Sequence, residues 1–180
     1  MNTVMGDPNE PLVDFITIHP RTRYTSSTTP IDTEALALLT SEFGPKIPIL
    51  LSGDVSTLSP LPLPTAAPRP SSTNIAGLMS ARALLRNPAL FAGYANCPWS
   101  AVEAFVRNVA RAPLPLRLVQ HHLSEMCGPG MGAEKAALLD RGERGELLRL
   151  GSMLEVMDFV DEKVAVKTGR VGGERRVADA

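Results

Sequence analysis

The sequence is poor in cysteine and in aromatic residues, and it has no excess of charge of either sign. Its 180 residues include two cysteines and 4% aromatic residues, and the formal net charge is -1. Cys97 and Cys127 are too few for a disulfide framework, and their spacing fits neither a zinc site nor a CxxC motif. We therefore expect reduced thiols. Because the overall charge is near zero, any contact with nucleic acid has to come from a local basic patch.

Long apolar runs are also missing. No stretch is long and apolar enough to cross a bilayer, and residues 1–10 lack the basic and apolar regions of a signal peptide. We expect a soluble cytoplasmic protein, with the nucleus as an alternative, that acts as a monomer and makes no use of a membrane. With 44% hydrophobic residues, the chain can bury a core.

Apolar segments in the first half of the chain predict an α/β fold. β-branched and apolar residues predict strands at 12–18, 47–51 and 74–82, and we expect the first to be buried on both faces. Asp32 is a candidate N-cap for a helix over 33–42. Strand, helix and strand in this order are typical of a parallel sheet or barrel.

The connection between the second and third predicted strands is unusual. Residues 55–73 are rich in proline, which forbids a continuous helix at a place where a crossover helix is expected. We expect either an extended loop that replaces the helix or a region that is abnormal for its fold.

The second half of the chain has helical periodicity. Capping boxes are predicted from Ser100 with Glu103 and from Ser152 with Glu155, each before an apolar stripe. The predicted helical segments are 98–112, Leu116 to Met126, an interrupted stretch over 134–150, and a last helix that begins near residue 152. We expect the tail from residue 168 to be disordered.

Small and polar residues follow each predicted strand. They are His19 to Arg23, Ser52 to Asp54, and Ala81 with Arg82. In a parallel barrel, the carboxyl ends of the strands surround the active site. Small residues there let backbone N–H groups approach an anion, and an arginine matches the oxygens of a phosphate. The pattern indicates a phosphate site between the last two strand ends.

These segments resemble a known family. "DFITIHPRTR", "IPILLSGDV" and "IAGLMSARALLRNPALFAGY" are similar to the carboxy-terminal half of the flavin-binding barrel of tRNA-dihydrouridine synthases, most of all the fungal position-20 type. "AVEAFVRNVARAPLPLRLVQHHLSEMCG" resembles the family's tRNA-binding helical domain. The resemblance implies the carboxy-terminal part of a TIM (β/α)8 barrel at 1–94, a small all-α domain at 95–167 and a disordered tail at 168–180.

The resemblance also implies a cofactor site. His19 would contact the flavin of FMN, and the backbone of two strand ends would hold its phosphate, with Arg82 adding positive charge. These phosphate-binding residues are Ser52, Gly53, Asp54, Ala81 and Arg82. Without the resemblance, the preferred interpretation of His19 would be a structural histidine at the rim of a barrel, with its hydrogen bonds made within the protein. Ser52 and Ala81 depart from the family pattern, which has asparagine and glycine at these positions.

For the substrate, the resemblance implies that basic side chains contact tRNA. These residues are Arg21, Arg23, Arg107, Arg111 and Arg117. A salt bridge between neighbouring loops is an equal alternative for the first two. A solvated helix face, with Glu103 paired to Arg107, is the alternative for the helical residues. His121 and His122 are adjacent on a helix and point in different directions, so we predict no metal site.

The family reaction transfers hydride from flavin, reduced by NADPH or NADH, to a uridine, while a cysteine acts as general acid. That cysteine lies upstream of every motif quoted above, and neither Cys97 nor Cys127 matches it. We therefore expect a truncated or mispredicted chain without a catalytic residue, inactive alone. A non-catalytic RNA-binding remnant is the alternative, and another phosphate-binding barrel enzyme is a remote third.

Overall fold

The computed structural model describes residues 5–7, 10–26, 28–56, 58, 75–131 and 135–169. The chain divides into two compact units, Met1–Ala83 and Leu84–Ala180, which are called the sheet unit and the helical unit below. The resemblance described above implies a barrel segment that ends at residue 94, whereas the contacts within the structure divide the chain after Ala83.

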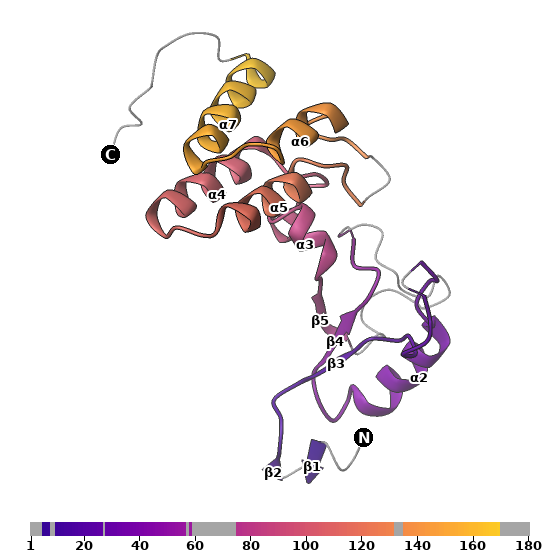
Figure 1. Cartoon of the computed structure of the whole chain (residues 1–180). Coiled ribbons are helices and arrows are strands. Elements are labelled where there is room, and N and C mark those ends of the chain that lie inside the picture. Colours follow the sequence, from indigo (N-terminus) through magenta and orange to yellow (C-terminus); the bar gives the residue numbers. More distant parts are fainter. Residues whose placement is uncertain are drawn as a thin grey trace. The chain divides into compact units, whose positions relative to one another are not determined.

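Within the described residues, the sheet unit contains a three-stranded parallel sheet. Its strands are β3 (Ile16–Ile18), β4 (Ile49–Ser52) and β5 (Ile75–Met79), in the order β3-β4-β5 (Figure 1). Ile18 is paired with Leu51, and Ser52 with Met79, so the carboxyl ends of the strands lie at one edge of the sheet. A separate antiparallel pair joins β1 (Gly6–Asp7) and β2 (Glu10–Pro11).

Helix α2 (Thr33–Phe43) packs on this sheet (Figure 1). The Asp32 side chain caps the helix by accepting a hydrogen bond from the Ala35 N–H at 2.9 Å, and Gly44 follows the last turn. Leu36 is buried together with Ile49 and Leu51 in one apolar cluster. The parallel α/β arrangement and the capped helix are therefore confirmed.

The prediction that 12–18 is a strand buried on both faces is wrong. Pairing with β4 begins only at Ile16, and Leu12 and Phe15 are 70% and 53% exposed. Apolar and β-branched composition does not distinguish a doubly covered strand from an edge strand, and β3 is at the edge of the described sheet. The predictions for the proline-rich connection concern residues that, between 59 and 73, lie outside the described part of the chain.

The described residues of the helical unit form the short η1 (Leu90–Ala92) and four longer helices. Helix α3 (Arg82–Arg86) crosses the boundary between the units. The longer helices are α4 (Trp99–Arg111), α5 (Leu116–Met126), α6 (Arg141–Leu147) and α7 (Met153–Thr168) (Figure 1). They bury one apolar core, to which Val102, Leu123 and Val156 contribute fully buried side chains. Within the described residues, no helix is long and apolar enough to span a membrane.

Helix ends separate the correct cap predictions from the wrong ones. Ser152 and Glu155 form the predicted capping box of α7. Ser100 does not cap α4, because the helix already begins at Trp99 after Pro98, whose fixed backbone suits a helix start. The third helix is shorter than the predicted 134–150 and starts from a capping box of Asp140 and Glu143 that the sequence analysis missed.

The predicted tail begins inside α7. Thr168 is the last residue of that helix, and Gly169, with φ of 71°, follows it as the C-cap. Left-handed glycine is a common way to end a helix. Residues 170–180 lie outside the described part of the chain.

Candidate functional site

The carboxyl ends of β4 and β5 form a small polar surface. The pairing of Ser52 with Met79 places the segments Ser52–Asp54 and Ser80–Arg82 next to each other. The Ser80 hydroxyl donates a hydrogen bond to the carbonyl of Val55 at 2.7 Å and ties the two segments together. The structure thus brings together two of the three strand ends that the sequence singled out.

The turn after β4 requires glycine. Gly53 has φ of 95° and Asp54 has φ of 53°, both in the left-handed region. A Cβ atom at Gly53 would lie 2.9 Å from Cγ2 of Ile31 and 3.0 Å from Cε1 of His19. The absence of a side chain therefore lets the imidazole of His19 pack directly on the turn.

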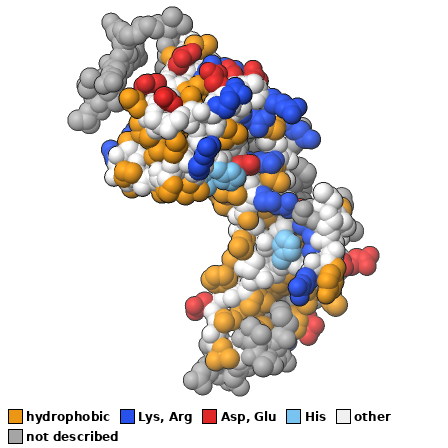
Figure 2. Space-filling view, in the orientation of Figure 1, with side chains coloured by type: hydrophobic (Ala, Val, Ile, Leu, Met, Phe, Trp, Pro, Cys, Tyr) orange, Lys and Arg blue, Asp and Glu red, His pale blue; other side chains and the backbone are white. Residues whose placement is uncertain are grey.

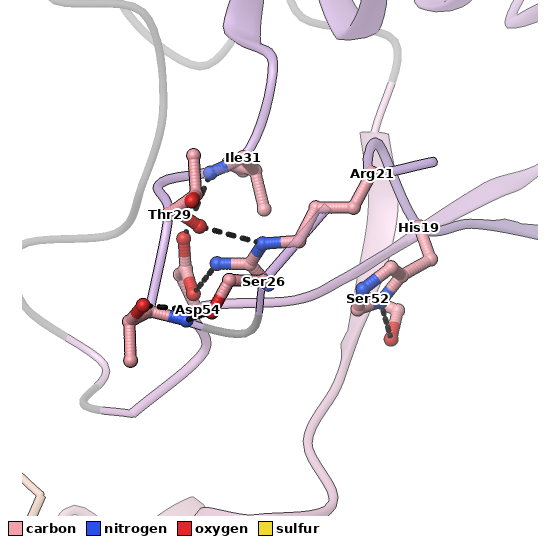
Figure 3. Close-up of polar contacts among 8 residues, drawn as sticks. His19, Arg21, Ser26, Thr29, Ile31, Ser52 and Asp54 are labelled. Atoms are coloured by element: carbon pink, nitrogen blue, oxygen red, sulfur yellow. Dashed lines mark hydrogen bonds and ion pairs between the residues drawn. The ribbon is translucent and has the colours of Figure 1, made fainter. Parts of the chain in front are cut away.

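His19, the first residue of the strand end at His19 to Arg23, reaches the same turn. Its Nδ1 lies 3.2 Å from the Ser52 hydroxyl, and its side chain remains exposed to solvent. Figure 3 shows the two side chains facing each other. All three strand ends are therefore connected: β3 through His19, β4 through Ser52 and β5 through Ser80.

Arg21 forms an ion pair with Asp54, in which the side chain of Arg21 is only 4% exposed and that of Asp54 is 30% exposed. Nη2 of Arg21 contacts the Asp54 carboxylate, and Nε donates to the Thr29 carbonyl at 2.7 Å (Figure 3). The second carboxylate oxygen of Asp54 accepts from the Ile31 N–H at 2.9 Å. This is the salt-bridge alternative for Arg21, and it leaves the guanidinium buried instead of presenting it to a tRNA phosphate.

The carboxyl group of Asp54 is held in its charged form. Partial burial alone would raise its pKa. The hydrogen bonds from Arg21 and Ile31 and the positive charges of Arg21 and Arg82 outweigh that effect, so the pKa lies below its ordinary value. For Asp54, the sequence was interpreted in terms of its backbone alone. An ion pair could have been predicted, because Arg21 follows β3, Asp54 follows β4, and these two parallel strands are neighbours.

The β5 end supplies a small residue and a positive charge. Ala81 and Arg82 are both exposed, and Arg82 is the first residue of α3. Because Arg21 neutralises Asp54, the net charge that this surface presents comes from Arg82. An exposed guanidinium, a turn in which Gly53 has no side chain and a small neighbour are features that phosphate sites commonly have, so these residues are compatible with a phosphate group such as that of FMN.

A cavity of about 430 Å³ opens beside this surface. Its wall includes His19 and Arg21, residues of the following loop such as Thr25 and Thr29, and Ala35 of the first turns of α2. Its volume is in the range of small-molecule sites. Apolar side chains and threonine hydroxyls line it together with the polar groups of His19, Arg21 and Asp32, so it can contact both apolar and polar parts of a ligand.

Three of the predicted tRNA contacts belong to the helical unit. Arg107 and Arg111 are exposed on α4 and, four residues apart, lie on the same helix face. Arg117 is exposed near the start of α5 and donates from Nη1 to the Leu148 carbonyl at 3.3 Å. Basic side chains are visible on the surface of both units in Figure 2. Arg23, in the sheet unit, is also exposed.

One histidine of the adjacent pair, His122, packs against an aromatic ring in the helical unit. The ring of His122 meets Phe105 edge to face, with 5.7 Å between centroids, while His121 is exposed. Among the residues that the structure describes, no three histidine, cysteine or acidic side chains gather in a group able to hold a metal ion.

The two cysteines are buried, unpaired thiols in the core of the helical unit. Burial raises the pKa of Cys97 to about 11 and that of Cys127 to about 12. Such thiols are unreactive at neutral pH.

The chain is similar to known proteins over most of its length. A family model described as dihydrouridine synthase (Dus) matches residues 13–135. The chain is 42% identical over 113 residues to a tRNA-dihydrouridine(20a/20b) synthase of Saccharomyces cerevisiae, covering 62% of this chain and 29% of the relative. It is 35% identical over 156 residues to a protein of the same name from Schizosaccharomyces pombe, covering 86% and 42%. Both names include NAD(P)+. The chain spans less than half the length of these relatives.

Proposed function

Because the chain belongs to the dihydrouridine synthase family, we propose that its sheet unit holds the phosphate end of FMN and that its helical unit binds tRNA. In this proposal the parallel strands β3, β4 and β5 are the carboxy-terminal part of a TIM barrel. The reaction served is the reduction of uridine to dihydrouridine in tRNA, with NADPH or NADH as reductant, in the cytoplasm or the nucleus.

One observation supports the flavin site above all others. The ends of β4 and β5 lie side by side, joined by the hydrogen bond from Ser80 to Val55, and they present a glycine turn and an exposed arginine. Barrels commonly bind a phosphate at the carboxyl ends of their last two strands. The relatives named above are tRNA-dihydrouridine synthases, which supplies the substrate for the proposal.

Each residue then has a definite task. When bound, FMN supplies the hydride transfer. The backbone of Ser52, Gly53, Asp54 and Ala81 approaches the phosphate, and Arg82 contributes charge. His19, oriented by the Ser52 hydroxyl, contacts the flavin. Arg21 keeps the turn in place and compensates the charge of Asp54, which would otherwise repel the phosphate.

The tRNA contacts in this proposal are the exposed arginines. They are Arg23, Arg107, Arg111 and Arg117. Basic side chains bind the phosphate backbone by releasing counterions, so they add affinity and little sequence information.

We also infer that the 180 residues alone do not complete the reaction. A general acid has to reach the uridine, and the two thiols of this chain are buried in the helical core. The check is to incubate the purified chain with FMN, NADPH and tRNA and to quantify dihydrouridine by mass spectrometry. Measurable product from this chain alone contradicts the inference.

A non-catalytic RNA-binding protein is the second candidate, favoured by the helical unit having its own buried core. The two candidates differ in flavin binding. A chain that binds tRNA in a salt-sensitive way and never binds flavin supports the second candidate.

The decisive experiment for the phosphate site compares FMN with riboflavin, which lacks the phosphate. We expect the chain to bind FMN more tightly than riboflavin in a fluorescence-quenching titration, and Arg82→Ala to remove most of the difference. Arg111→Ala removes the same charge from α4 and is the matched control, with no expected effect. Equal affinity for FMN and riboflavin, or an equal effect of both substitutions, overturns the assignment.

A further inference from the structure

The loop after β3 presents an aromatic side chain that the proposed flavin site does not use. Tyr24 is 90% exposed. The guanidinium carbon of Arg23 lies 5.9 Å from the centroid of the Tyr24 ring, within the range of a cation–π contact. A single exposed aromatic residue needs no explanation by itself, but this one lies on a hydrogen-bonded turn.

The backbone holds Arg23 and Tyr24 at the tip of a hydrogen-bonded turn. The N–H of Thr25 donates to the carbonyl of Thr22 at 3.1 Å, which makes Arg23 and Tyr24 the two central residues of a β-turn. The hydroxyls of Thr22 and Thr25 lie 2.7 Å apart and close the same turn from the side-chain face. Both central side chains are exposed as a result.

The turn is in addition fixed to the candidate site. Arg21, directly before it, is buried against Asp54, and its Nε donates to the Thr29 carbonyl at the far end of the loop. The N–H of Thr29 donates to the carbonyl of Ser26 at 3.1 Å. An anchored loop loses less conformational entropy on binding than a mobile one, so an aromatic ring at its tip is a suitable contact surface.

We propose that Tyr24 and Arg23 form a stacking platform for an unpaired nucleobase of the RNA substrate. The inference rests on the proposed tRNA function and deepens it by naming the part of the RNA that is bound. Every base has a face that stacks on an aromatic ring, and an adjacent guanidinium serves the phosphate that follows. A base within a duplex offers only its edge, so the partner is a base in a single-stranded loop.

The bound base is a neighbour of the reacting uridine and not the uridine itself. The reacting ring has to lie against the flavin, where water is excluded. Tyr24, at 90% exposure, is open to solvent, outside such an enclosed position. The platform therefore orients the loop of the RNA and performs no chemistry.

The test measures binding of labelled RNA by fluorescence anisotropy for the full chain and its Tyr24 variants. The probes are an unmodified tRNA and a blunt RNA duplex without unpaired bases. We expect Tyr24→Ala and Tyr24→Leu to weaken tRNA binding about 5- to 150-fold, the range for the loss of one base–aromatic stack. Tyr24→Phe keeps the ring and is expected to stay within about twofold of the unsubstituted chain. None of the three changes is expected to alter duplex binding.

Several outcomes overturn the platform. It is wrong if Tyr24→Ala binds tRNA as tightly as the unsubstituted chain, if Tyr24→Leu matches Tyr24→Phe, or if duplex binding falls in parallel with tRNA binding. If the Tyr24 variants bind normally while Arg107→Ala weakens tRNA binding, the platform fails and the tRNA function stands. If the unsubstituted chain binds no tRNA at all, both fail.

Discussion

At the scale of single residues, the ion pair of Arg21 and Asp54 determines the geometry of the strand ends. Each of its groups makes a further bond, Arg21 to the Thr29 carbonyl and Asp54 to the Ile31 N–H. The sequence predicted that both residues follow the carboxyl ends of strands. It left a salt bridge and a tRNA contact as equal alternatives for Arg21, because only the folded backbone brings together two residues that are 33 positions apart.

The first prediction concerns the stability of this pair. Arg21→Ala leaves the Asp54 carboxylate without its partner and should lower the free energy of unfolding of the sheet unit by about 2–3 kcal/mol. The expected loss is below that of a fully buried pair, because Asp54 remains 30% exposed. Arg23→Ala, two positions away on the exposed turn, is the control and should cost about 0.5 kcal/mol or less. Hydrogen exchange of the β4 amides measures the loss of stability in each variant. Equal protection in the two variants contradicts the prediction.

The second prediction concerns pH. Because the folded-state pKa of Asp54 lies below its ordinary value of 3.8, the stabilisation is complete above that value and is lost as the pH falls through the lower folded pKa. β4 amide protection should therefore decrease on acidification below about pH 4. Asp54→Asn has no carboxyl group to titrate and should have a flatter pH profile in this range. Identical acid profiles of the two proteins would show that other carboxyl groups are responsible.

The third prediction concerns Gly53. Gly53→Ala combines a left-handed backbone with contacts of 2.9 and 3.0 Å to Ile31 and His19. Gly93, with φ of 90°, has the same backbone conformation and nothing within 4 Å of an added Cβ. Gly93→Ala should cost about 1–2 kcal/mol from backbone strain alone, and Gly53→Ala at least about 1 kcal/mol more from the close contacts. Urea unfolding followed by circular dichroism measures each cost, and equal losses would mean that His19 and Ile31 move aside freely.

At the scale of secondary structure elements, the helical pattern together with the signals at its ends, such as the Asp32 N-cap, was sufficient to predict α2 and α5 close to their observed bounds. Hydrophobic periodicity alone fixes a helix less closely. It was not sufficient for helix starts. Ser100 and Ser152 both precede a glutamate by three residues, but only Ser152 caps, because the backbone at Pro98 starts α4 earlier. The sequence also predicted β3 too long, since its apolar residues do not show where pairing with β4 begins.

The fourth prediction uses this contrast between the two serines. The Ser152 hydroxyl accepts a hydrogen bond from the Glu155 N–H at 3.2 Å, so Ser152→Ala should destabilise the helical unit by about 1 kcal/mol. Ser100→Ala replaces an exposed serine inside α4 and should leave stability unchanged or slightly higher, because alanine is the better helix former. Unfolding followed by the fluorescence of Trp99 reports on this unit. A larger loss of stability for Ser100→Ala than for Ser152→Ala would mean that Ser100 caps α4 after all.

At the scale of the whole molecule, the sequence motifs were sufficient to predict the family. The division of the chain into two units is visible only in the structure. The family can be predicted from strand ends such as His19 to Arg23, because the motif is defined by residue types that can be read directly in the sequence. The division after Ala83 depends on which residues contact each other, and the segment from 84 to 94 has no compositional break that would mark it.

The fifth prediction tests the helical unit as an RNA-binding surface. If Arg107 and Arg111 each contact a phosphate, each alanine substitution should lower the slope of log affinity for tRNA against log salt by about 1. Lys46→Ala removes one positive charge from the sheet unit and is the control, with an expected change near zero. A slope that is unchanged in both arginine variants would assign them to a solvated face.

The order β3-β4-β5 has a practical consequence for work with this chain. Among the described residues, β3 and β5 each have a partner strand on one side only. Open strand edges recruit strands from other molecules, which is a common origin of β-rich precipitates. Yield and shelf life in concentrated solution are therefore expected to depend on these two edges more than on the well-packed helices. A short peptide or a binding protein that covers one edge should act as a preservative during purification and storage.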